Sequence, residues 1–130
     1  MLRVYTSEQN NEQVGPHFKV KEFACKDGSA ITFIDDYMVT ILELLRKELG
    51  NKPIIITSGY RTPAHNAKVG GAKYSYHMRG MAVDIRVNGI PAKEVAKALD
   101  KIVGSYGIIV YESWVHFDVR DGKKYRKGMT

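Results

Sequence analysis

The feature that most constrains the fold is one apolar stripe that runs from Ile34 to Leu49. Its members recur at three- and four-residue intervals and are Ile34, Tyr37, Met38, Ile41, Leu42, Leu45 and Leu49. This spacing places them on one face of an α-helix. Asp35 and Asp36 suit the positive end of such a helix, and Gly50 can end it. Because the stripe must be buried against a second layer, we expect the rest of the chain to supply that layer.

Four short segments predict β-strands that can form the second layer. They are residues 53–57, 82–87, 108–111 and 114–119. The first is apolar on both faces, as in a buried central strand, whereas the last alternates apolar and polar residues. A second helix is expected from Pro91 to Gly104, and a brief one at residues 64–69. The pattern therefore predicts an α+β domain with helices packed on a small, mainly antiparallel sheet.

Length and composition limit the number of domains that the chain can form and the classes of partner that it can bind. The 130 residues suffice for a single domain, which we expect at residues 17–122, with a loosely held arm at 1–16 and a basic, solvated tail at 123–130. With 20 Lys and Arg against 14 Asp and Glu, the net charge of +6 favours an anionic partner such as nucleic acid, a membrane surface or a cell wall. No nucleic-acid-binding motif is visible, so a nucleic-acid partner is not expected.

The sequence also sets expectations for redox state and location. Cys25 is the only cysteine, so no intramolecular disulfide can form, and we expect a small half-buried residue there. The first residues lack the apolar core of a signal peptide, and no run reaches the ~18 apolar residues of a membrane span. We therefore expect a protein that is made in the cytoplasm and reaches any outside target by another route. We also expect it to be a monomer.

Residues 75–85 contain the group with the clearest chemical meaning. His77 and Asp84 lie seven positions apart, and Gly80 between them permits a sharp bend. His116 lies downstream in the last predicted strand. Because side chains alternate along a strand, Asp84 and His116 are expected opposite the apolar rows of their strands. Two histidines and one carboxylate match the ligand set of a catalytic zinc, which keeps a fourth position for water.

Each of these residues also has a structural explanation that the spacing leaves open. A single histidine on a strand is usually structural, and Asp118 can be an ordinary surface carboxylate. His17 and His65 have no carboxylate partner in their segments and are not assigned to the site. Cys25 is only a third choice as a ligand. The spacing thus indicates a metal site without deciding between it and a set of structural side chains.

Three separated motifs make the chain resemble a known family. Ser75 to Asp84 reads Ser-x-His-x-x-Gly-x-Ala-x-Asp, residues 114–118 read Trp-Val-His-Phe-Asp, and residues 58–66 contain an upstream arginine motif. In this order they resemble the M15 family of zinc D-Ala-D-Ala carboxypeptidases and related peptidoglycan endopeptidases. Residues 17–28 are similar to the start of a carboxypeptidase-like subgroup that is common in phages. The resemblance implies the hedgehog/D-Ala-D-Ala-peptidase-like α+β fold.

The resemblance also implies roles for individual residues. His77, Asp84 and His116 would be the ligands of one zinc ion. Arg61 would bind the substrate carbonyl or terminal carboxylate, for which a guanidinium fork is suited. Ser75 would hydrogen-bond the peptide substrate or orient His77.

The general base is where the sequence departs from the family. Well-studied members carry a carboxylate three residues before the last histidine ligand, and Ser113 occupies that position here. The two candidates are Glu112, one position earlier, and Asp118, two positions after His116. We favour Glu112, with Asp118 as the alternative or as a partner that orients a ligand.

These expectations lead to one predicted function and one alternative. The predicted function is hydrolysis of an amide bond in a peptidoglycan stem peptide or cross-bridge by zinc-activated water, as a carboxypeptidase or an endolysin-type endopeptidase. The lack of a recognisable leader favours a phage-type lysis enzyme or a tail-associated protein that acts on the cell wall. The alternative is a non-catalytic, zinc-stabilised wall-binding domain that has lost its general base.

Overall fold

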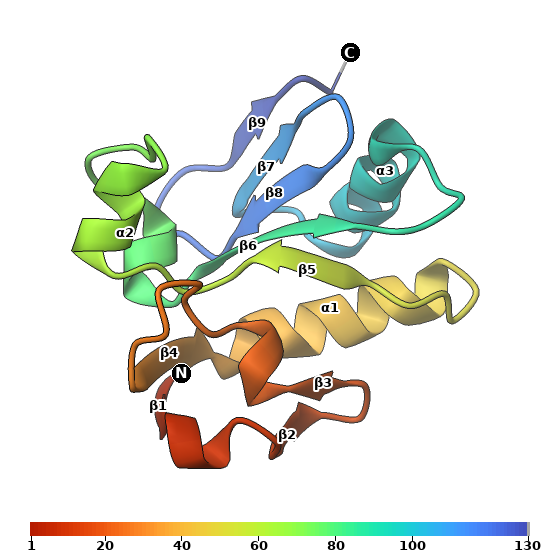
Figure 1. Ribbon diagram of the computed structural model, residues 1–130. Helices are drawn as coiled ribbons and strands as arrows, with labels where there is room; N and C mark the ends of the chain where they lie inside the picture. Colours follow the sequence, from red (N-terminus) through yellow and green to blue (C-terminus); the bar gives the residue numbers. More distant parts are fainter. Residues whose placement is uncertain (130) are drawn as a thin grey trace.

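A five-stranded sheet forms the centre of the fold in the computed structural model, which describes residues 1–129 (Figure 1). From one edge to the other the strands are β5 (Ile55–Ser58), β6 (Ala82–Arg86), β8 (Val115–Asp118), β7 (Gly107–Val110) and β9 (Tyr125–Lys127). Neighbouring strands are antiparallel except for β7 and β9, which are parallel. The predicted α+β class and the mainly antiparallel sheet are therefore confirmed.

Helices α1 (Asp36–Glu48) and α3 (Ala92–Ile102) share the hydrophobic core with this sheet. The α3 helix contacts β7 and β8, and the two helices contact each other. Asp35 caps α1, since its side chain accepts hydrogen bonds from the backbone amides of Tyr37 and Met38. The helix predicted from the apolar stripe is confirmed, and the stripe residues buried along it are Met38, Ile41, Leu42 and Leu45.

Strands β6 and β8 turn one face to the core and the other to the candidate site. Four apolar side chains on the core face are completely buried: Val83, Ile85, Val115 and Phe117. Because side chains alternate, Asp84 and His116 point to the opposite face, and they are paired directly in the β6–β8 register. Helix α2 (Pro63–Lys68) and the 3₁₀ turn η3 (Tyr76–Arg79) lie together at one end of the sheet (Figure 1).

The N-terminal part differs from the loosely held arm that we expected. It contains β1 (Leu2–Thr6), η1 (Ser7–Gln9), β2 (Gln13–Gly15), β3 (Phe18–Lys19), η2 (Val20–Glu22) and β4 (Ile31–Asp35). Strand β1 pairs with β4 along its full length, and β2 pairs with β3. The N-terminal amine and Arg3 also bind the Asp36 carboxylate, at 2.8 and 3.0 Å. Strand β4 was not predicted because its alternation overlaps the start of the helical stripe at Ile34.

Part of the predicted tail joins the sheet as β9 rather than lying free in solvent. Arg126 on this strand donates from Nε to Asp100 at 2.7 Å and from Nη1 to the carbonyl of Tyr106 at 2.8 Å. Thr130, the last residue of that tail, lies outside the described residues, and the domain boundaries stay predictions. Within residues 1–129, no helix is both long and apolar enough to cross a membrane.

Candidate metal centre

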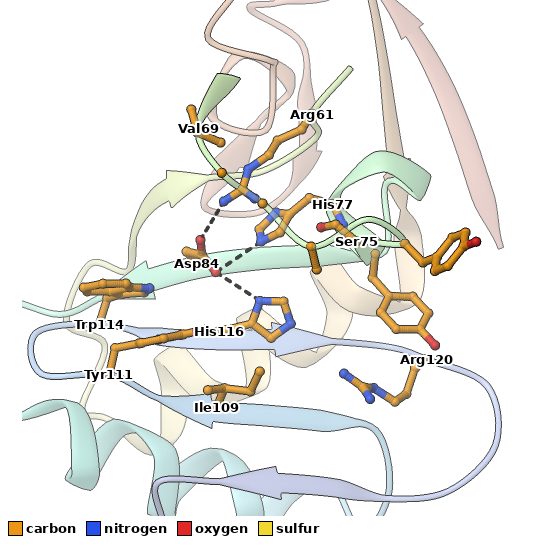
Figure 2. Close-up of a pocket in the computed structure, with 15 residues that line it drawn as sticks. Arg61, Val69, Ser75, His77, Asp84, Ile109, Tyr111, Trp114, His116 and Arg120 are labelled. Atoms are coloured by element: carbon orange, nitrogen blue, oxygen red, sulfur yellow. Dashed lines mark hydrogen bonds and ion pairs between the residues drawn. The ribbon is translucent and has the colours of Figure 1, made fainter. Parts of the chain in front are cut away.

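Three side chains from three different elements meet at the candidate metal centre. His77 comes from η3, Asp84 from β6 and His116 from β8. Nε2 of His77 lies 3.2 Å, and Nδ1 of His116 3.1 Å, from Oδ1 of Asp84 (Figure 2). Each residue offers one ligand atom, and these atoms all lie within 4.8 Å of one another. The fold thus brings together the three residues that we predicted as zinc ligands.

Local structure around η3 fixes the position of His77. Ser75 begins the turn, and its Oγ accepts a hydrogen bond from the backbone amide of His77 at 3.2 Å. Gly80 ends the turn with a φ of 70°, which favours glycine, and a Cβ there would overlap neighbouring backbone. Nδ1 of His77 lies 2.7 Å from the carbonyl oxygen of Gly59, so Nε2 is the nitrogen presented to Asp84. The predicted bend at Gly80 is confirmed.

His116 is held from behind by a buried carboxylate. Its Nε2 lies 2.7 Å from Oδ2 of Asp118, which is fully buried. Arg120 donates from Nε and Nη2 to the two oxygens of Asp118, each at 2.7 Å. Gly107 on β7 leaves room for this pair, because a Cβ there would overlap the Asp118 carboxylate. One hydrogen-bonded chain therefore runs from Asp84 through His116 and Asp118 to Arg120.

The charges along this chain stabilise one another. Burial alone would raise the pKa of Asp84, but hydrogen bonds with His116 and His77 hold it well below its usual range. Burial would also raise the pKa of Asp118, yet its bonds with Arg120 and His116 lower it to about 2. For His116, burial lowers the pKa, but the two neighbouring carboxylates outweigh this effect and raise it. Both carboxylates are therefore anionic at neutral pH, which suits a bound cation.

The donor set fits a divalent transition metal such as zinc. Two imidazole nitrogens and one carboxylate oxygen converge, which leaves a further position for water or substrate. The other nitrogen of each histidine faces an oxygen, the Gly59 carbonyl for His77 and the Asp118 carboxylate for His116. Such contacts orient imidazole ligands and increase their basicity. Both the triad and the groups that contact it from outside are therefore suited to binding a metal ion.

Arg61 lies beside the metal centre and is held by three side chains. Its Nη2 donates to Oδ2 of Asp84 at 3.2 Å. Its Nη1 and Nε donate to Asn66 and Ser58, at 3.2 and 3.0 Å. Asn66 is itself buried and donates to the carbonyl of Ala72 at 2.8 Å. Arg61 is thus tied to the carboxylate of Asp84, a predicted ligand, by a contact that the sequence did not predict.

The metal centre opens into a cleft of about 430 Å³ (Figure 2). This volume lies within the range of small-ligand sites. The cleft is lined by Arg61, Val69, Gly70, Gly71, Ala72, Tyr74, Ser75, Tyr76, His77, Asp84, Ile109, Tyr111, Trp114, His116 and Arg120. The rings of Tyr111 and Trp114 stack with centroids 4.5 Å apart. Figure 2 shows these two rings on one side of the triad and Arg120 on the other.

The two candidates for the general base occupy different environments. Glu112 is exposed in the turn between β7 and β8 and is not among the residues that line the cleft, and Ser113 beside it is also exposed. Asp118 is fully buried and both of its oxygens are already bonded, to His116 and Arg120. Their catalytic roles stay predictions. Arg120 received no role from the sequence, because its contacts depend on how β7, β8 and β9 pair.

A buried His-Asp-His group in a cleft is the arrangement found in metal-dependent hydrolases. Comparison with known families gives the particular one. Residues 16–118 match the Peptidase M15 family, and the chain belongs to this family. The resemblance described from the three motifs is therefore confirmed.

Individual relatives match parts of the chain. It is 41% identical to the zinc D-Ala-D-Ala carboxypeptidase of Streptomyces albus G over 59 residues. This match covers 44% of this chain and 23% of that protein. It is 35% identical to the peptidoglycan L,D-endopeptidase MepK of Escherichia coli K12 over 95 residues. This match covers 68% of this chain and 52% of that protein. The chain thus spans about half or less of the length of these relatives.

Proposed function

We propose that the protein is a zinc-dependent peptidase that hydrolyses an amide bond in peptidoglycan peptides. The observation that carries this proposal is the convergence of His77, Asp84 and His116 within 4.8 Å at an open cleft. Membership of the Peptidase M15 family supports it, and so do the names of two relatives, a zinc D-Ala-D-Ala carboxypeptidase and a peptidoglycan L,D-endopeptidase. Whether the bond is terminal or internal is left open by these two relatives, which differ in this respect.

In this proposal His77, Asp84 and His116 hold the ion. Bound zinc supplies Lewis acidity and lowers the pKa of a coordinated water toward ~7. The chain's own groups prepare the site: the Gly59 carbonyl and Asp118 orient the two imidazoles. Arg61 fixes the second oxygen of Asp84 and offers its remaining N–H groups to the substrate carbonyl.

We further propose that Glu112 accepts the proton of the attacking water and that Asp118 positions His116. Asp118 is a poor proton acceptor because its pKa lies near 2 and its oxygens are already bonded. Within residues 1–129 Glu112 has no such contacts, and it lies in the turn that follows Tyr111, a residue of the cleft wall. This assignment requires the turn to bring Glu112 toward the cleft when substrate is bound.

A non-catalytic wall-binding domain stabilised by zinc is the second candidate. One specific observation favours it: among the described residues that line the cleft, Asp84 is the sole carboxylate. Such a domain would bind peptidoglycan and zinc without turnover. A role as a phage-type lysis or virion-associated enzyme is a separate proposal, which the resemblance of residues 17–28 to a subgroup common in phages supports.

Digestion of purified cell walls tests the two candidates directly. Walls of several peptide chemotypes are incubated with zinc-loaded protein, with chelator-treated protein and with protein to which zinc is restored. Products are identified by mass. A peptidase gives fragments that disappear with chelator and return with zinc, and their masses identify the bond. Wall binding without any new fragment on all chemotypes contradicts the proposed activity and supports the binding domain.

A further inference from the structure

The cleft contains two arginines with different degrees of engagement. All three side-chain nitrogens of Arg61 have partners, namely Ser58, Asn66 and Asp84. Arg120 uses Nε and Nη2 for Asp118, whereas Nη1 has no hydrogen-bond partner within residues 1–129. Within residues 1–129, the one enclosed side-chain nitrogen or oxygen without a partner is Nε of Arg46. Nη1 of Arg120 is therefore accessible and not enclosed by the protein. One edge of the Arg120 guanidinium is therefore open at the cleft wall.

Arg120 is held in place before any ligand arrives. Its guanidinium carbon lies 4.9 Å from the ring centroid of Tyr76 and 4.6 Å from that of Tyr125. The two-pronged bond to Asp118 fixes its plane, and the side chain is only 19% exposed. A guanidinium fixed in this way loses little conformational entropy when its free edge binds an anion. The most suitable anion is a carboxylate, which matches the planar donor geometry.

The surroundings of Arg120 favour an anion as well. Lys73 lies over the ring of Tyr74, at 5.4 Å, and Arg79 lies over the ring of Tyr76, at 5.3 Å. Both rings line the same cleft. The opposite side of the metal centre carries the stacked rings of Trp114 and Tyr111 (Figure 2). Lys73 and Arg79 lie outside the cleft lining, so Arg120 is the cation that lines the cleft next to Tyr76. The stacked aromatic rings lie on the other side of the triad (Figure 2).

We propose that Arg120 is a specificity residue whose free guanidinium edge binds a carboxylate of the peptide substrate. This inference rests on the proposed function, since it assigns a direction to the peptide in the same cleft. The carboxylate lies toward Tyr76, and the part of the substrate beyond the scissile bond lies toward Trp114. Wall peptides contain carboxylates at the chain end and at internal positions, and both share this chemistry.

The single tryptophan of the chain provides a binding signal that does not require catalysis. Trp114 lines the cleft, so its fluorescence reports occupancy in chelator-treated protein, where the peptide is not consumed. The probes are a synthetic stem tetrapeptide with free carboxylates and three amidated forms, modified at the C-terminus, at the internal carboxylates, or at both. We expect the fully free peptide to bind at least tenfold more tightly than the fully amidated one. Equal affinities of these two peptides overturn the proposal.

Variants assign the preference to Arg120. Arg120→Gln is expected to bind free and amidated peptides alike, whereas Arg79→Gln, which removes a nearby charge outside the cleft lining, retains the preference. Retention of the preference by Arg120→Gln contradicts the proposal. Arg120→Lys keeps the charge without the planar fork and is expected to reduce the preference, and circular dichroism and zinc content verify that each variant is folded. If Arg120→Gln does not fold, the proposal is still tested by two measurements: the affinities of the wild-type protein for free and amidated peptides, and the same preference in Arg120→Lys.

The pattern of amidation identifies the source of the carboxylate. Loss of affinity on C-terminal amidation alone indicates recognition of a chain end, and loss on internal amidation alone indicates an internal residue. With zinc restored, Arg120→Gln is expected to raise KM for the free peptide about tenfold at unchanged zinc content. If the protein prefers free carboxylates but hydrolyses no peptide, the proposed function is contradicted and the role of Arg120 is not. If it hydrolyses peptides without a carboxylate preference, only the role of Arg120 is contradicted.

Discussion

Asp118 is a fully buried carboxylate that bonds both to a proposed metal ligand and to a cleft arginine. Its contacts with His116 and Arg120 are each 2.7 Å long. Side chains that orient a metal ligand in this way raise metal affinity without touching the ion. The structure therefore places the two candidate carboxylates, of which the sequence favoured Glu112, in different environments: Asp118 is buried and bonded to His116, whereas Glu112 is exposed. We accordingly propose that Asp118 orients His116 and that Glu112 accepts the proton.

Asp118→Asn is expected to weaken zinc binding by about 10- to 100-fold, because the amide cannot accept the same bonds from both neighbours. Competition with a chromogenic chelator measures the affinity. Asp121→Asn in the exposed turn beyond β8 serves as the matched control and is expected to bind zinc like the wild type. An unchanged affinity in Asp118→Asn shows that this carboxylate does not orient the site.

Glu112→Gln is expected to lower kcat by about 10²- to 10⁴-fold while leaving zinc affinity unchanged, since only the proton acceptor is removed. Turnover of a defined wall peptide and zinc content are measured on the same preparation. Glu94→Gln, an exposed carboxylate on α3, is the control. Near-normal turnover of Glu112→Gln with zinc bound would make our assignment of the base wrong.

At the scale of elements, β7 influences the site although none of its side chains is a proposed ligand. Gly107 faces the Asp118 carboxylate and Nε of Arg120, and a Cβ at this position would overlap both. The carboxylate is buried and fixed by its hydrogen bonds, so it cannot move aside without breaking them. The close packing of β7 against β8 thus determines the geometry of the chain that supports His116.

Gly107→Ala is accordingly expected to cost about 1–3 kcal/mol of unfolding free energy, the usual range for overpacking, and to weaken zinc binding. Chemical denaturation and zinc titration measure the two effects. Gly104→Ala is the matched control, because a Cβ at Gly104 meets no atom within 4 Å. Equal stability of the two variants contradicts this view of the β7–β8 contact.

The elements that the sequence predicted well are those with a complete local pattern. Helix α1 carries its own stripe and its own cap at Asp35, so its position needed no knowledge of the rest of the fold. Strand β4 was missed because its five residues run directly into that helix, and β9 was missed because three residues have no measurable period. Strand pairing over long separations, as between β1 and β4, is not encoded by any local periodicity.

The same distinction explains which site residues were found. His77, Asp84 and His116 lie in recognisable motifs, so the sequence placed them together. Arg120 lies just past the last motif, and its importance depends on Tyr76, 44 positions earlier, and on Tyr125 in β9. Contacts of this kind follow from tertiary packing and cannot be obtained from spacing.

For the whole molecule, the triad connects η3, β6 and β8, so metal binding should stabilise the fold as well as the site. Zinc at 100 times its dissociation constant is expected to raise the free energy of unfolding by about 2.7 kcal/mol, provided that the unfolded chain does not bind it. Thermal unfolding with zinc and with chelator measures the difference. His77→Ala should lose this response, and His65→Ala, outside the triad, should keep it. A zinc response that survives in His77→Ala would falsify the proposed ligand set.

The parallel addition of β9 to β7 separates two properties of the protein along the chain. The proposed ligands lie on η3, β6 and β8, whereas the ring of Tyr125, which packs on Arg120 at 4.6 Å, belongs to the last strand. If Arg120 binds a substrate carboxylate as proposed, exchange of Tyr125 is expected to change substrate preference without touching any of the three proposed ligands. Directed evolution of substrate preference therefore has a position on the last strand, away from the proposed ligands, on which to act.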